Sequence, residues 1–161
     1  MIIERICVAT DGSDVAVRAA QMAVLLARTG TGRIVALSVA QPQFSMAPAL
    51  ASAPDLEAEL ARALKAAHAH VDTVARIAQS GGVACEKLIK LGSSPGAEIV
   101  KVAEELGCDL IVMGAHGPNE PDRLATGSVA RHVLAWSSIP VLVLRDPREA
   151  STPEFSDRAF P

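Results

Sequence analysis

Glycines and a serine at a defined spacing form a candidate binding segment in the second half of the sequence. Two residues separate Gly114 from Gly117, and nine more precede Gly127 and Ser128. Closely spaced glycines let the backbone approach a ligand, because no Cβ stands in the way. If Gly127 and Ser128 begin a helix, its unpaired N–H groups and positive dipole end would suit a phosphate. The same spacing also fits a turn followed by a helix that Ser128 caps.

Residues 92–96 read Gly-Ser-Ser-Pro-Gly and match the Gly-x-Ser-x-Gly pattern of serine hydrolases. In those enzymes the residue after the nucleophile donates its N–H to the oxyanion, and Pro95 has no N–H. We therefore exclude a hydrolase of this type, and Ser94 before Pro95 is instead typical of a helix start. The chain also lacks a Gly-Lys-Ser/Thr phosphate loop, so the standard equipment for fast phosphoryl transfer is missing.

Two pairs of residues with ring side chains could bind a metal or a substrate. His68 and His70 are two residues apart in a predicted helix, so they project in different directions and cannot share a metal as an i, i+4 pair does. We expect both to lie in solvent. His132 and Trp136 are four residues apart, and we expect them to pack against each other rather than to take part in catalysis.

Short β-branched runs alternate with longer segments of helical periodicity along most of the chain. This alternation predicts a parallel sheet covered by helices on both faces. In such sheets ligands bind beyond the carboxyl ends of the strands, where the strand order reverses. The loops after the first and fourth strands are therefore the places to look for a site. The expected strands are 6–9, 33–39, 83–91, 110–113 and 141–145, and the expected helices are 14–28, 55–80, 94–106 and 127–136.

Two segments lack this periodicity. Residues 40–54 contain three prolines and little charge, and so long an irregular stretch indicates a mobile flap or a binding loop. Residues 147–161 are rich in proline, serine and charge, which predicts a flexible C-terminal tail. We expect residues 1–146 to form a single domain.

The composition limits the classes of function. The 161 residues include 15 basic and 18 acidic side chains, a net charge of −3, with three Phe, one Trp and no Tyr. Without a basic field or a set of stacking aromatics, we expect no binding to nucleic acid. The three cysteines show no Cys-x-x-Cys spacing, which favours a reducing compartment. No apolar run approaches the length of a membrane helix, so we expect a cytoplasmic protein without membrane insertion.

The spacing Gly-x2-Gly-x9-Gly-Ser, placed after an apolar strand and before a helix, resembles the nucleotide signature of the universal stress protein family. The acidic loop after the first strand and the terminal run Ser138–Leu144 are also similar to that family, and the likeness covers about residues 2–146. It implies a Rossmann-like α/β fold, with a five-stranded parallel sheet in the order 3-2-1-4-5 and helices on both faces.

The resemblance also implies roles for particular residues. Asp11 would hold the ribose hydroxyls, since a carboxylate can accept two O–H hydrogen bonds, although an Asp before a Gly is also common in turns. Val39 would contact adenine, and the glycine segment would surround the phosphates. Glu120 and Asp122 could hold a divalent metal such as Mg²⁺ on the phosphates, or they could be solvated loop charges. The implied nucleotide-binding residues are Ala9, Thr10, Asp11, Val39, Met113, Gly114, His116, Gly117, Gly127, Ser128 and Val129.

The function implied by the resemblance is the binding of ATP, or of ADP or AMP, as a regulatory ligand in a stress response, with an unidentified regulatory protein as a possible partner. Two alternatives stay open: a slow ATPase or nucleotidyl-transfer enzyme, and a structural dimer that binds no nucleotide. The resemblance also implies a homodimer through the last strand. There, Val141–Leu144 would otherwise leave an apolar sheet edge exposed.

Overall fold

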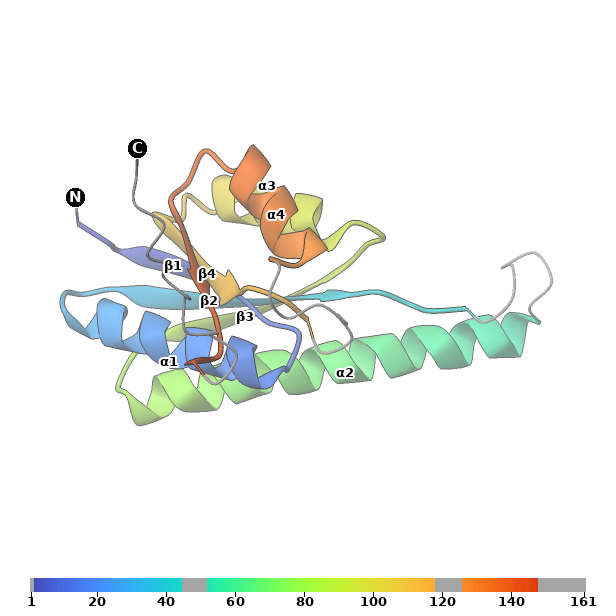
Figure 1. The fold of residues 1–161 in the computed structure, drawn as a ribbon. Coiled ribbons are helices and arrows are strands. Elements are labelled where there is room, and N and C mark those ends of the chain that lie inside the picture. Colours follow the sequence, from blue (N-terminus) through green and yellow to red (C-terminus); the bar gives the residue numbers. More distant parts are fainter. Residues whose placement is uncertain (1, 45–51, 118–125, 148–161) are drawn as a thin grey trace, which may run out of the picture.

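The computed structural model describes residues 2–44, 52–117 and 126–147, which form an α/β domain around one parallel sheet (Figure 1). The sheet has five strands in the order β3-β2-β1-β4-β5, and every neighbouring pair is parallel. The strand order therefore reverses between β1 and β4, as the family resemblance predicts. The strands are β1 (Arg5–Ala9), β2 (Arg33–Ala40), β3 (Cys85–Leu91), β4 (Leu110–Gly114) and β5 (Val141–Leu144), and the helices are α1 (Asp14–Arg28), α2 (Ala53–Ser80), α3 (Pro95–Glu105) and α4 (Ser128–Trp136).

The central strands are buried on both faces, because helices cover the sheet from two sides. Alternate side chains of β1 enter two separate hydrophobic cores. Ile6 and Val8 pack beneath α1 and α2, whereas Cys7 and Ala9 pack beneath α3 and α4. Figure 1 shows these two helical layers on opposite sides of the sheet. The continuous apolar runs in the sequence are thus those of a central parallel sheet.

Helix α2 begins earlier than the sequence analysis predicts. The sequence favours Asp55 as the N-cap, whereas in the structure Ser52 is the N-cap, Ala53 is the first helical residue, and Asp55 completes a capping box with Ser52. The irregular stretch predicted for 40–54 is correspondingly shorter, because Ala40 belongs to β2 and residues from 53 are helical. Residues 45–51 lie outside the described residues, so the flap itself stays a prediction.

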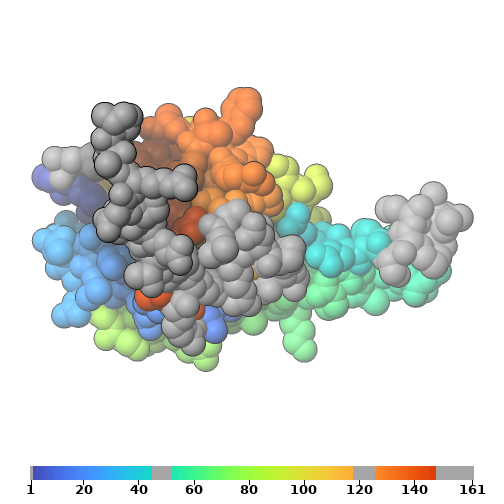
Figure 2. Space-filling model, viewed as in Figure 1, coloured from blue at the N-terminus to red at the C-terminus, as the bar shows by residue number. Residues whose placement is uncertain are grey.

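The N-terminal half of α2 extends beyond the sheet, and the residues that follow β2 lie along it (Figures 1 and 2). The backbone N–H of Gln43 donates to the Glu59 carboxylate, which also accepts two hydrogen bonds from Arg62. These bonds, first that of Arg62 and then that of Gln43, lower the pKa of Glu59 to about 2. The carboxylate therefore stays charged and continues to hold the segment after β2 against the helix.

The end of the domain folds back onto its first helix. The Asp146 side chain is buried and lies 3.9 Å from the Arg18 guanidinium on α1. Beyond Pro147, the predicted tail lies outside the described residues.

Strand β3 begins at Cys85 rather than Val83, because Val83 belongs to the turn through Gly81 and Gly82. There its N–H donates to the Ala78 carbonyl. No described helix is both long and apolar enough to cross a membrane.

Candidate functional site

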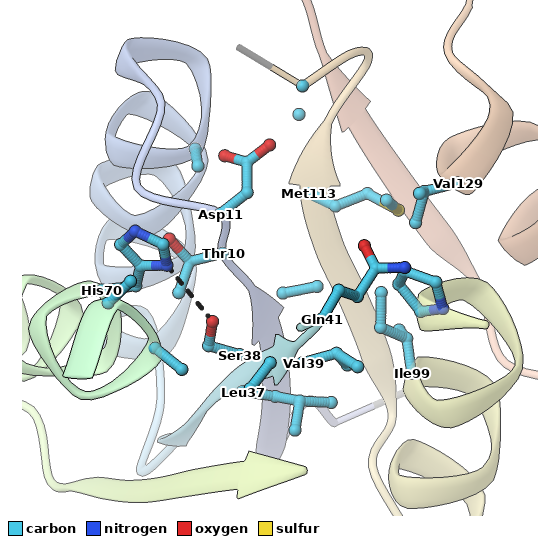
Figure 3. A pocket seen from close by; sticks show the side chains of 18 of the residues that line it. Thr10, Asp11, Leu37, Ser38, Val39, Gln41, His70, Ile99, Met113 and Val129 are labelled. Atoms are coloured by element: carbon cyan, nitrogen blue, oxygen red, sulfur yellow. Dashed lines mark hydrogen bonds between the residues drawn. The ribbon is translucent and has the colours of Figure 1, made fainter. Parts of the chain in front are cut away.

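A cavity of about 400 Å³ lies at the carboxyl ends of β1, β2 and β4, where the strand order reverses (Figure 3). Its walls come from the loop after β1, the end of β2, the middle of α2, the end of β4 and the start of α4. This is the place at which doubly wound sheets bind ligands. All eleven residues that the sequence analysis selects line the cavity: Ala9, Thr10, Asp11, Val39, Met113, Gly114, His116, Gly117, Gly127, Ser128 and Val129. Their role in binding stays a prediction.

The two loops that carry these residues meet at the cavity. A Cβ built on Gly117 would lie only 3.1 Å from Asp11 Oδ2, although the two residues are far apart in the sequence. The Gly127 N–H donates to the Ala115 carbonyl at 2.6 Å, and the Ala115 N–H donates to Leu144 at 2.8 Å. The chain before α4 is thereby held against the end of β4, across from Asp11.

The loop after β1 presents the Asp11 carboxylate outward. Oδ1 accepts the Ser13 N–H at 2.9 Å, and Thr10 Oγ1 accepts the Gly12 N–H at 3.2 Å. Gly12 has a φ of +78°, a conformation that favours glycine. These contacts fix the turn while Oδ2 stays on the cavity side, beside Gly117. The exposed carboxylate can therefore accept hydrogen bonds from a ligand.

Helix α4 begins at the cavity. Its N-cap, Gly127, is extended and has no side chain with which to cap the helix. Ser128, Val129 and Ala130 in the first turn all line the cavity. The positive end of the helix dipole and its first N–H groups thus lie at the cavity wall, an arrangement that suits an anion.

The opposite part of the cavity is mostly apolar, although the side-chain amide of Gln41 also lies there (Figure 3). Val39 from β2, Ile99 from α3, Met113 from β4 and Val129 from α4 point toward a common space (Figure 3). A flat, largely apolar ring could be buried among these side chains. The cavity therefore combines an apolar compartment, an exposed carboxylate and a helix N-terminus, which match the base, sugar and phosphates of a nucleotide.

Comparison with known proteins decides the family. The model of the universal stress protein family matches residues 3–145. The chain belongs to the universal stress protein family. Universal stress protein MJ0531 of Methanocaldococcus jannaschii is 30% identical over 148 residues, which are 92% of this chain and 85% of that protein.

Solved structures of universal stress proteins share the fold. UspA from Lactobacillus plantarum superposes with a TM-score of 0.77 at 29% identity, covering 90% of this chain and 99% of that one. The universal stress protein from Archaeoglobus fulgidus in complex with dAMP has a TM-score of 0.65 at 25% identity, covering 90% of this chain and 100% of that one.

Several residues that line this universal stress protein's cavity are not among those that the sequence analysis selects, and His70 is the titratable one for which it expects another environment. His70, expected in solvent, is half-buried in the cavity wall, and its Nδ1 lies 3.3 Å from Ser38 Oγ. Burial lowers the pKa of His70 below its usual value of 6.5, and the nearby charge of Asp11 partly opposes this shift. The sequence did contain one indication that His70 is partly buried. It lies three residues after Ala67 and therefore beside the row of buried residues on α2. The expectation for His68, which is exposed, is confirmed.

The other motifs take the structural roles expected of them. Pro95 is the first residue of α3 and Ser94 is its N-cap, so this segment begins a helix. The rings of His132 and Trp136 pack at a centroid distance of 6.1 Å. Glu120 and Asp122 lie outside the described residues. Within the described ranges, no group of three or more His, Cys, Asp or Glu side chains could hold a metal ion.

Proposed function

We propose that the protein binds ATP or a related adenine nucleotide in this cavity and acts as a regulatory nucleotide-binding protein in a stress response. The observation that carries the proposal is the meeting of Asp11, the glycine segment and the start of α4 around one cavity. The dAMP complex of the Archaeoglobus fulgidus relative supports an adenine nucleotide as the ligand class.

Each part of the nucleotide has a matching part of the cavity. Adenine would lie among Val39, Met113 and the neighbouring apolar side chains, and the ribose hydroxyls would donate to Asp11. The phosphates would lie against Gly117 and the first turn of α4, with Mg²⁺ accompanying a triphosphate. We propose that this protein acts in the cytoplasm, and that a partner protein reads the bound state.

A thermal-melt titration tests this proposal. ATP with Mg²⁺ at 100 times its Kd should add about 2.7 kcal/mol to the free energy of unfolding and raise the melting temperature. Asp11→Ala should remove most of this gain, because the sugar loses its acceptor. The matched control is Asp14→Ala. Asp14 is an exposed acid three residues after Asp11, but it does not line the cavity.

A flat response of the unmutated protein to ATP, ADP and AMP would contradict nucleotide binding and favour a purely structural role. Rapid phosphate release by the purified protein, lost in Asp11→Ala, would instead favour an ATPase.

We also propose a homodimer formed through β5. The Pro140 carbonyl accepts a hydrogen bond from the Ile111 N–H, and the Leu144 carbonyl accepts one from the Ala115 N–H. The backbone hydrogen-bonding groups of residues 140, 142 and 144 therefore point toward β4. The N–H and C=O of Val143 then face outward, where a second copy could pair with them.

Val143→Pro should therefore convert the dimer to a monomer without breaking the β4 ladder, because proline is tolerated at an outward-facing edge position. Sedimentation measures the mass, and circular dichroism confirms that the fold is kept. A folded variant that sediments like the unmutated protein would rule out this interface.

A further inference from the structure

Gln41 places a side-chain amide among the apolar side chains of the cavity. It comes directly after β2 and two residues after Val39, so the two side chains leave the chain on the same face. Figure 3 shows the Gln41 side chain extending toward Ile99 and Val129, away from Asp11. The compartment proposed for a flat ring therefore contains a side chain that can hydrogen-bond to the edge of that ring.

Two hydrogen bonds connect this part of the chain to the loop after β3. The Gly92 N–H donates to the Ala40 carbonyl at 3.2 Å, which continues the ladder between β2 and β3 as far as the residue before Gln41. Gln41 Nε2 then donates to the Ser93 carbonyl at 3.3 Å. Backbone pairing therefore places Gln41, and the bond to Ser93 places its amide.

The bond to Ser93 also decides which end of the amide faces the cavity. The oxygen and nitrogen of a glutamine amide exchange places by a half-turn, and the hydrogen-bond partners determine which arrangement is present. A backbone carbonyl can only accept, so Ser93 requires Nε2 on its own side. The Oε1 atom of Gln41, an acceptor without a hydrogen, is then directed to the apolar compartment.

An acceptor at this place distinguishes between classes of purine. The 6-amino group of adenine donates hydrogen bonds, whereas a 6-oxo purine such as guanine carries an oxygen there that only accepts. In the proposed pose the sugar lies at Asp11, and the 6-position is at the end of the base remote from the sugar. Gln41 lies on the side of the cavity away from Asp11 (Figure 3). Its Oε1 atom would accept from a 6-amino group and repel a 6-oxo group.

We infer that Gln41 is a specificity-determining residue of the nucleotide site, which accepts a hydrogen bond from the 6-amino group of the base and so favours adenine over 6-oxo purine nucleotides. This inference rests on the proposed function and adds to it a residue and a selectivity. The bond to Ser93 is essential to the selectivity. Without it, the amide could turn its N–H groups toward a 6-oxo oxygen and bind both classes of purine.

The test compares by calorimetry the Kd values of ATP, inosine triphosphate and purine riboside triphosphate, which has no substituent at the 6-position. The unmutated protein should bind ATP roughly tenfold more tightly than inosine triphosphate, because two acceptors would face each other. It should bind ATP about fivefold more tightly than purine riboside triphosphate, since one hydrogen bond is lost.

Gln41→Met should lose most of both preferences, because a side chain of similar length no longer offers an acceptor. Gln41→Glu keeps acceptors but cannot donate to Ser93. It should therefore retain the preference for ATP over inosine triphosphate while binding both more weakly. Gln21→Met is the matched control, because Gln21 is an exposed glutamine on α1 that does not line the cavity. It should keep all three Kd values.

The outcomes separate this inference from the proposed function. If Gln41 only ties the two loops together, Gln41→Met will weaken the three nucleotides equally and keep both preferences, which overturns the inference and leaves the nucleotide site standing. Equal binding of ATP and inosine triphosphate by the unmutated protein would have the same meaning. If Gln41→Glu loses the preference as completely as Gln41→Met, the acceptor role is overturned. Failure of the unmutated protein to bind any of the three would overturn both proposals.

Discussion

Gly117→Val should abolish most of the stabilisation by ATP while leaving the unliganded protein folded. The first added carbon alone would lie 3.1 Å from Asp11 Oδ2, and the two methyl groups would displace this carboxylate or fill the cavity. Gly117 does not have a positive φ, so its backbone accepts a valine. If Kd rises a hundredfold, the ATP concentration that adds about 2.7 kcal/mol to the unmutated protein would add only about 0.4 kcal/mol.

The matched control is Gly30→Val, because a Cβ at Gly30 meets no atom within 4 Å. Its melting temperature should rise with ATP as that of the unmutated protein does. The measurement is the ligand-induced shift, taken for each variant against its own unliganded melt. An unimpaired shift in Gly117→Val would show that the nucleotide does not pass between this loop and Asp11.

The second large effect concerns folding rather than binding. Gly114→Ala should destabilise the protein by about 1–3 kcal/mol, the usual range for overpacking a filled core. A Cβ at Gly114 would lie 2.7 Å from Val15 Cγ1 and 3.5 Å from the Ala16 backbone nitrogen. The end of β4 and the start of α1 are thus too close to admit a side chain.

Combining this substitution with Val15→Ala provides the check. Val15→Ala removes the methyl group that the new Cβ meets and leaves Val15 Cβ at 3.3 Å. The double variant should therefore be more stable than the sum of the two single changes predicts, by roughly 0.5–3 kcal/mol. Urea unfolding measures all three variants. Strict additivity would mean that the contact with Val15 is not what excludes a side chain at Gly114.

The sequence predicts the fold better than it predicts the limits of its elements. The apolar runs of β1 and β4 are unambiguous, because both faces of these strands are buried. The strand order follows from the family resemblance, since periodicity cannot say which strands are neighbours. The predicted start of α2 was wrong because Asp55 and Ser52 are both residue types that favour the N-cap position. The reciprocal hydrogen bonds between these two residues make Ser52 the N-cap.

The candidate site was predicted as far as its local motifs reach. The spacing of Gly114, Gly117, Gly127 and Ser128 can be recognised within one segment of sequence. Asp11 can be recognised as an acid in the loop directly after the first strand. His70 was missed because its place in the cavity wall depends on Gly12 and Ser38, which are distant in the sequence and bring no spacing pattern with them. A single histidine near a helix stripe has the same local signal whether it faces a cavity or water.

The length of α2 has a consequence for communication within the molecule. A helix of 28 residues is roughly 42 Å long, and its middle forms one wall of the cavity while its first turns project past the sheet. If the helix tilts as a rigid rod, the projecting turns and the wall residues Ala63 and Ala67 move together. A partner protein bound to these first turns of α2 would then change the affinity of the cavity for its ligand. The ligand would change the affinity for the partner by the same factor, as thermodynamic linkage requires.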